Sequence, residues 1–283
     1  MTSTSAQSVV ILGGGPAGLT AAYRLIRHGY RVTIVDRGSA VGNALSGGDL
    51  QQVPDPFTIL GCHHATHALL HLLHPTQQQP DGTIIPLEFR LPNGSLVHYP
   101  RTAFPSPLHT WVNLLRFTGI PWKERWRLAS WVEQLWEGET ELPADLEHRT
   151  ADDWLTSIGQ SGQTCRVVWN PLAQWLTGND LGTMSADAFV RSMKPVFLST
   201  HPDSRISVLQ DSLLTRFIQP IIKVLIQGNA TILPNTEATQ LHYKQDRISG
   251  VQLRDGSLLQ ADWYVTALPP QQLTPLLPER WLT

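Results

Sequence analysis

The chain is poor in charge, poor in cysteine and free of long apolar runs. Charged side chains make up 16% of its 283 residues and the formal net charge is −2, so no basic surface for nucleic acid is expected. Two cysteines, Cys62 and Cys165, exclude a disulfide scaffold and favour a reducing compartment, which predicts a cytoplasmic protein. No run of about 18 apolar residues occurs, so no membrane-spanning helix is predicted. The opening residues carry no basic charge, so no signal peptide is predicted either.

Hydrophobic residues, by contrast, make up 41% of the chain, and 10 residues are tryptophan. This composition excludes a disordered chain and is sufficient for one large core or two smaller ones. It also predicts extensive apolar surface that is either buried or faces a ligand.

The first residues follow the strand–turn–helix pattern of a dinucleotide-binding unit. Residues 9–12 form an apolar run typical of a buried parallel strand, and Gly13, Gly15 and Gly18 then complete a G-x-G-x-x-G motif. Gly13 permits the tight turn, Gly15 lets the backbone approach a pyrophosphate, and Gly18 lets the helix pack closely on the strand. The amino end of that helix offers unpaired N–H groups and a positive dipole end to the phosphates.

The residues after the motif complete the unit. Gly29 ends the helix, residues 31–35 form a second strand, and Asp36 follows about 20 residues after the glycines. A carboxylate at this point accepts hydrogen bonds from ribose hydroxyls and repels a 2′-phosphate, which disfavours NADP. The glycines alone do not separate FAD from NAD. The motif stands at the start of the chain with no repeated βα array after it, and this favours FAD.

Four histidines recur at helical spacing in residues 62–74, which are predicted to form a helix before Pro75. They are His63, His67, His71 and His74. Two histidines on one helix face can hold a metal ion, but no cysteine or acidic residue joins this row. The favoured interpretation is a mixed surface face that titrates in part, and no metal site is predicted.

The middle of the chain predicts a hairpin followed by helices. Residues 81–98 contain two strands joined by a Pro-Asn-Gly turn, and residues 110–119 and 122–136 are amphipathic. The second amphipathic segment carries Trp122, Trp126, Trp131 and Trp136 on much of its apolar face. Two interpretations of this face stay open, either a lipid tunnel or bilayer contact, or simply core.

The later residues predict helices and then a meander. Thr150 is an expected N-cap with Asp153 as its partner, so Asp152 and Asp153 indicate a helix start rather than a catalytic pair. Further helices are predicted at residues 163–176, 185–197 and 213–227. Strands are predicted near residues 230–233, 236–243, 247–253, 258–260 and 262–267, as a β-meander that returns to the parallel sheet.

The glycine motif and its flanks resemble the flavin-dependent amine oxidase and phytoene desaturase superfamily. The pattern consists of Gly13, Gly15, Gly18, Ala22, Leu25 and Gly29. Other passages resemble more narrowly the hydroxysqualene dehydroxylase family, the squalene-associated FAD-dependent desaturases of hopanoid biosynthesis. These passages are residues 59–62, 105–108, 150–155, 168–172 and 265–270. The resemblance implies an α/β fold, in which a Rossmann-like FAD-binding domain of amine oxidase type carries an inserted, largely helical substrate domain.

The same resemblance implies a domain plan and a set of cofactor contacts. Residues 1–80 and 205–283 are expected to form the discontinuous FAD-binding domain, and residues 81–204 the substrate domain. The predicted contacts to FAD are Gly13, Gly15, Pro16, Ala17, Gly18, Asp36, Arg37, Gly42 and Ala238. Gly42 stands where family members carry a Gly-Gly-Arg-like turn, here without the arginine. Family members continue well beyond Pro270, so a truncated or partial chain is expected.

The implied activity is the reduction of hydroxysqualene to squalene by reduced FAD, with the hydroxyl lost as water. The implied substrate is therefore a long apolar isoprenoid, and peripheral membrane contact stays open. No acid–base residue stands out, and no catalytic residue is predicted. A carotenoid (phytoene-type) desaturase or another amine oxidase-like flavoenzyme is the alternative enzyme. The alternative of another class is a non-catalytic remnant, or a partial chain that needs a partner.

Overall fold

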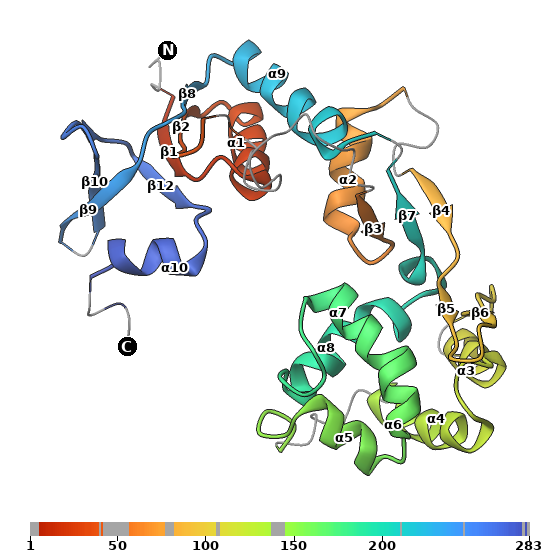
Figure 1. Cartoon of the computed structure of the whole chain (residues 1–283). Coiled ribbons are helices and arrows are strands. Elements are labelled where there is room, and N and C mark those ends of the chain that lie inside the picture. The colour runs from red at the N-terminus through yellow and green to blue at the C-terminus, as the bar shows by residue number, and fades with distance from the viewer. Residues whose placement is uncertain are drawn as a thin grey trace. The chain divides into compact units, whose positions relative to one another are not determined.

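The computed structural model describes residues 6–39, 41, 57–76, 82–105, 108–136, 145–209, 211–245, 247–278 and 281. The chain divides into two compact units, a first unit of residues 1–56 and 211–283 and a second unit of residues 57–210 (Figure 1). These boundaries differ from the expected ones near residues 80 and 204. The reason is that β3 (Thr58–Leu60) pairs with β7 (Ile206–Val208), which ties both ends of the insertion into the second unit. The cofactor and substrate roles of the two units remain predictions.

A four-stranded parallel sheet forms the centre of the first unit, in the order β12-β1-β2-β8. Its strands are β1 (Ser8–Leu12), β2 (Arg31–Val35), β8 (Thr231–Leu233) and β12 (Trp263–Thr266). In β1 the residues from Val9 to Leu12 are all buried, as a strand covered on both faces requires. The start of β1 also contacts the residue before β12, because the N–H and Oγ of Ser8 both donate to Asp262 Oδ2 at 2.7 Å.

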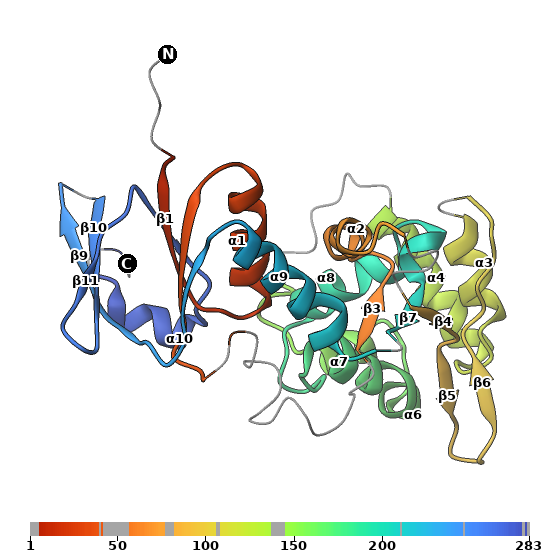
Figure 2. The ribbon, with the colours of Figure 1, turned by 90° about the horizontal axis from the view of Figure 1, so that it is seen from above.

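Two layers cover the parallel sheet, which lies between helices and a meander (Figures 1 and 2). On one side α1 (Pro16–Arg27) packs against α9 (Gln219–Gln227), and Leu19 of α1 is fully buried. On the other side is the antiparallel meander of β9 (Ala238–Lys244), β10 (Arg247–Leu253) and β11 (Leu258–Leu259). Val10 and Leu12 of β1 share a core with Val251 of the meander. After β12 the chain forms α10 (Pro270–Leu273) and a 3₁₀ turn (Thr274–Leu276).

The predicted strands and helices of the first unit are confirmed to within about two residues. One difference is a π-helical turn at Leu214–Ile218, which begins the helix predicted for residues 213–227 and leads directly into α9. The predicted Rossmann-like parallel sheet with its returning meander is therefore the fold of this unit.

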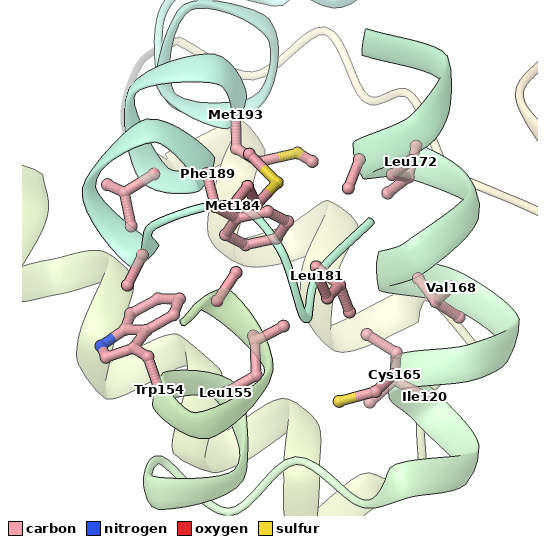
Figure 3. Close-up of a cluster of buried hydrophobic side chains, with 14 of the residues drawn as sticks. Ile120, Trp154, Leu155, Cys165, Val168, Leu172, Leu181, Met184, Phe189 and Met193 are labelled. Carbon is pink, nitrogen blue, oxygen red and sulfur yellow. The ribbon is translucent and has the colours of Figure 1, made fainter. Parts of the chain in front are cut away.

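The second unit is mostly helical. Its helices are α2 (His64–Leu73), α3 (Leu108–Arg116), α4 (Trp122–Trp136), α5 (Ala151–Ser157), α6 (Gly162–Thr164), α7 (Asn170–Thr177) and α8 (Ala186–Phe197). A π-helical turn (Cys165–Trp169) precedes α7, and a 3₁₀ turn (His201–Ser204) follows α8. The core of these helices gathers Trp154 and Leu155 from α5, Leu172 from α7 and Phe189 from α8 (Figure 3).

Short strands make up the remainder of the second unit. β3, β7 and β4 (Thr83–Ile85) form an antiparallel sheet, and β5 (Glu88–Arg90) pairs with β6 (Leu96–His98) in a hairpin. The predicted hairpin is confirmed, with Gly94 at φ +83° in its turn. The first predicted strand is split, however, because β4 pairs with β7 and only β5 enters the hairpin.

The tryptophans of α4 do not form one apolar face. Trp122 and Trp126 are 57% and 58% exposed, whereas Trp131 packs edge-on against Trp154 with ring centroids 4.8 Å apart. The core interpretation therefore holds for Trp131 and is wrong for the first two. The side chain of Trp136 lies outside the described residues.

The helix start predicted at Thr150 is confirmed. The Asp153 N–H donates to Thr150 Oγ1 at 3.1 Å, and Thr150 Oγ1 donates to the Asp153 carboxylate at 2.7 Å. Asp153 is thus an element of the helix cap, as the sequence indicated.

Candidate cofactor site

The glycine turn after β1 leaves no room for side chains at two positions. Gly13 has φ +100°, and a Cβ there would lie 3.0 Å from the carbonyl oxygen of Ala267. A Cβ on Gly18 would lie 1.9 Å from the carbonyl oxygen of Gly13. Gly13 therefore permits the turn and Gly18 permits the close approach of helix and turn, which are the roles that the motif predicts.

Gly14 is a third crowded glycine of the turn, which the motif does not specify. Its N–H donates to Asp36 Oδ2, and a Cβ on it would lie 2.1 Å from the side chain of Val41. The other carboxylate oxygen of Asp36 accepts from the Gly38 N–H at 2.7 Å. Asp36 thus holds the glycine turn in shape, and each oxygen keeps a lone pair for a ribose hydroxyl. The run of three consecutive glycines, residues 13–15, is the sequence feature that points to Gly14. The sequence alone does not say which of the three donates its N–H to the Asp36 carboxylate.

Helix α1 points its amino end at the same place. Gly15 is the N-cap with φ −70° and ψ 179°, and Pro16 is the first helical residue. No side chain caps this end and no acidic residue lies in its first turn. The free N–H groups and the helix dipole therefore remain available to an anionic group.

These residues border a pocket of about 740 Å³ at the carboxyl ends of β1 and β2. The pocket volume lies in the range of roughly 300–1,000 Å³ that is usual for ligand sites. β2 and β12 flank β1 on opposite sides, so the pocket opens where the strand order reverses, the usual ligand position in this class of sheet.

The structure brings most of the predicted cofactor residues to this pocket. The lining residues among them are Gly13, Gly15, Pro16, Ala17, Asp36, Arg37 and Ala238. Gly18 lies against the turn without lining the pocket, and Gly42 lies outside the described residues. Their contact with a bound cofactor stays a prediction.

The pocket wall extends beyond these predicted contacts. Thr236 and Glu237 line it before β9, and the Thr236 N–H donates to the Asp36 carbonyl oxygen at 2.8 Å. Leu268, Gln272 and Leu276 line it after β12. The signal for this last group was the apolar strand ending at residue 266, whose parallel pairing with β1 puts the following residues beside the glycine turn.

The pocket fits the adenosine diphosphate part of a dinucleotide. The amino end of α1 suits the phosphates, the Asp36 carboxylate suits ribose hydroxyls, and Ala238 and Leu276 give apolar wall for a base. The glycine turn supports this fit, since Gly13 and Gly15 line the pocket and present only backbone to it.

Among the described residues, the other candidate groups that the sequence singled out do not form a second binding site. In those ranges no three or more His, Cys, Asp or Glu side chains gather as metal ligands. His67 of the histidine row bonds the Leu60 carbonyl oxygen through Nε2 at 2.9 Å. Within the same ranges no helix has the length and apolar character needed to cross a membrane.

Comparison with known proteins agrees with this geometry. Residues 8–154 match the family described as FAD dependent oxidoreductase (DAO). The chain is 26% identical over 289 residues to a D-amino acid dehydrogenase of Methylobacterium radiotolerans, covering 95% of this chain and 63% of that protein. It is 24% identical over 169 residues to a 15-cis-phytoene desaturase of Synechococcus elongatus, covering 54% of this chain and 35% of that protein.

Solved structures show the same fold. A putrescine oxidase bound to putrescine is similar with a TM-score of 0.62 at 17% identity, over 99% of this chain and 63% of that one. A fatty acid isomerase from P. acnes gives a TM-score of 0.57 at 15% identity, over 95% of this chain and 60% of that one. The chain thus spans less than two thirds of the length of these relatives. The predicted fold and cofactor are confirmed at the level of the family, because the chain belongs to the FAD dependent oxidoreductase family.

Proposed function

We propose that this chain carries the cofactor-binding and substrate-binding parts of an FAD-dependent oxidoreductase that reduces hydroxysqualene to squalene. The observation that carries the redox part is the pocket at the amino end of α1, with Asp36 at its edge. The finer proposal rests on the passages that resemble the hydroxysqualene dehydroxylase family. The net reaction replaces the C–OH bond by C–H, takes up two electrons and two protons, and releases water.

The residues of the first unit would bind and orient the cofactor. The N–H groups of the first turn of α1 would hold the pyrophosphate, and Asp36 would accept from the ribose. Leu268 and Leu276 would exclude water from the base. Bound FAD would supply the electron-transfer chemistry, and the protein the placement.

A small apolar cavity lies within the core of the second unit. The cavity holds about 90 Å³ and its wall is almost wholly apolar, with rings from Phe89, Phe117 and Phe189 and aliphatic side chains between them. Such a wall stabilises hydrocarbon and offers little to a charged amine. The cavity has room for a short hydrocarbon segment only, so the choice of an isoprenoid over the amine and amino-acid substrates that the relatives' names suggest rests on the passages that resemble the hydroxysqualene dehydroxylase family.

A carotenoid desaturase is the second candidate function. The similarity to the 15-cis-phytoene desaturase favours it, and a carotenoid is as apolar as hydroxysqualene. The two candidates differ in the direction of electron flow, because a desaturase removes hydrogen and lengthens the conjugated system. Incubation with phytoene would then give a coloured product.

An absorbance spectrum of the purified chain, before and after incubation with FAD and desalting, tests the cofactor part. We expect stoichiometric retained flavin in the wild type and none in Gly18→Ala. A wild-type chain that stays colourless would overturn the proposal for this chain and favour the non-catalytic or partial-chain alternative.

Anaerobic incubation of the reduced holoprotein with hydroxysqualene tests the substrate part, with squalene measured by mass spectrometry. Squalene formed in step with flavin reoxidation is the expected result. Flavin that is retained and reducible but yields no squalene would contradict this substrate, and the phytoene incubation would then decide for or against the desaturase.

A further inference from the structure

Two segments of the second unit are tied to α3. The N–H and Oγ1 of Thr102 donate to Asn113 Oδ1 at 3.0 and 2.8 Å, which fixes the segment that enters α3. Thr110 Oγ1 donates to the carbonyl oxygen of Phe197 at 2.9 Å, which fixes the end of α8. The residues beside these bonds are therefore held close to one another.

Four basic side chains lie near this junction, within range of one another's charge, and we name them the basic cluster: Arg101, His109, His201 and Arg205. Burial, and then the positive charge of Arg205, lower the pKa of Arg101. Burial followed by the charges of the two arginines lowers the pKa of His201. Burial and His201 likewise lower the pKa of His109, against a smaller opposing effect of Asp203. The members of the cluster therefore repel one another's positive charge.

The nearest carboxylate is already occupied. Asp203 is 3% exposed and accepts from the Thr200 N–H at 2.8 Å, from Thr200 Oγ1 at 2.6 Å and from His64 Nε2 at 2.5 Å. Among the ion pairs of the described residues, none includes Arg101 or Arg205. The two arginines of the cluster thus carry positive charge without an ion-pair partner among the described residues.

Two atoms of the cluster are buried without a partner in the described part of the chain. They are Arg101 Nε and His109 Nδ1, and the His109 side chain belongs to a residue only 1% exposed. Buried polar atoms are nearly always hydrogen-bonded, so each exception calls for an explanation. A ligand oxygen bearing negative charge would accept from Arg101 and from a protonated His109, and would relieve the mutual repulsion.

The apolar cavity borders the basic cluster at Thr110, whose Oγ1 lies 3.3 Å from His109 Nε2. Tyr99, Thr110 and Leu198 line the cavity, and each stands one to three positions along the chain from a cluster member. The Tyr99 ring contacts the ring of Phe197 at 5.3 Å and that of Phe117 at 5.5 Å, so aromatic wall follows directly. One ligand can therefore meet charge at one end and hydrocarbon at the other.

We propose that the second unit binds an amphipathic oxyanion, a carboxylate or phosphate group on an apolar chain, with its head on the basic cluster and its chain toward the cavity. This goes beyond the proposed redox function, because hydroxysqualene carries no charge. It also does not depend on that function, since the site lies in one unit and needs no flavin.

Titration of the full chain with soluble amphiphiles tests the proposal. The probes are dodecanoate and dodecyl phosphate below their micelle concentrations, with 1-dodecanol and inorganic phosphate as comparisons. Binding is followed by calorimetry and by tryptophan fluorescence, to which Trp154 and Trp169 of the cavity wall contribute. We expect at least one of the two anions to bind about tenfold or more tightly than either comparison compound. The tighter of the two identifies the headgroup.

Substitutions separate the site from general detergent-like binding. Arg101→Gln should weaken the anion about tenfold or more, while Arg191→Gln, at an exposed arginine of the same unit, should not change it. Arg205→Gln is the second variant, because Arg205 is exposed and its substitution is expected to leave the fold intact. Equal affinity for dodecanol and both anions, or anion binding unchanged in both cluster variants, would overturn the proposal. Inorganic phosphate bound as tightly as dodecyl phosphate would overturn the part that concerns the apolar chain.

Discussion

The two units differ in which atoms face their cavities. In the first unit the pocket is bordered by a glycine turn, the free N–H groups of a helix end and one carboxylate, so its recognition is mainly by backbone. In the second unit the cavity wall consists almost entirely of aromatic and aliphatic side chains, and the basic cluster borders it at His109. Backbone recognition depends on the absence of side chains, whereas a side-chain cavity depends on their volume. The two units should therefore respond oppositely to changes in side-chain size.

Removing volume from the second unit should have the largest effect. Phe189 is 3% exposed and its ring contacts those of Trp154 and Trp169. Phe189→Ala should lower the free energy of unfolding by about 3–5 kcal/mol, measured by urea denaturation. Trp175→Ala, at a residue 40% exposed, should change it by no more than about 0.5 kcal/mol. Equal losses in the two variants would contradict the side-chain description of this core.

Adding volume to the first unit should have the next largest effect. Gly18→Ala places a Cβ 1.9 Å from the Gly13 carbonyl oxygen, so turn and helix must move apart. We expect a loss of about 1–3 kcal/mol in stability and no retained flavin in the desalted protein. Gly182→Ala is the matched control, because nothing lies within 4 Å of its added carbon. Full flavin retention by Gly18→Ala would show that the close approach is not needed.

Asp203→Asn tests a polar contact of the second unit and its pH dependence. Burial alone would raise the pKa of this carboxyl, but hydrogen bonds from Thr200, His64 and Ser199 outweigh burial and hold it well below the usual range. A lowered folded-state pKa stabilises the fold above the unfolded pKa of about 3.9 and loses that contribution as pH falls. The variant should therefore lose about 1–3 kcal/mol at neutral pH and approach the wild type below about pH 4. The exposed Asp145→Asn should show no such convergence in urea titrations.

Asp36→Asn should have the smallest effect. It removes the charge that accepts from the ribose but keeps one acceptor and the side-chain shape, so FAD affinity should fall about twofold to tenfold. Quenching of flavin fluorescence measures it, with Asp255→Asn in an exposed turn as control. An unchanged affinity would mean that the carboxylate serves only the glycine turn.

The sequence predicts the first unit well because its signals are local. The glycines, the apolar runs and the alternating strands each specify their own conformation, and the parallel pairing follows from the βαβ connection. What it does not predict is Gly14, whose role depends on where Asp36 and Val41 lie in space. Motif spacing carries no information on that.

The second unit is predicted as a set of helices but not as a packed core. Helical periodicity predicts the same apolar face for Trp126 and Trp131 of α4. Only the position of Trp154, on another helix, decides which of the two packs into the core. β3 and β7 have three residues each and are separated in sequence by most of the second unit, so no local pattern predicts their pairing. The basic cluster is likewise a product of tertiary structure, since its members come from three separate segments.

The pairing of β1 with β12 has a consequence for synthesis on the ribosome. β1 emerges before the second unit, whereas its neighbour at Trp263–Thr266 emerges only after the entire second unit has been made. Until then one long edge of β1 lacks its partner strand and the Ala267 side of the pocket is missing. The second unit can therefore complete its own contacts while the first unit still lacks β12, because contacts that are distant in sequence form late. FAD binding is therefore expected late in the synthesis of this protein, and a nascent chain stalled before residue 263 should not hold FAD.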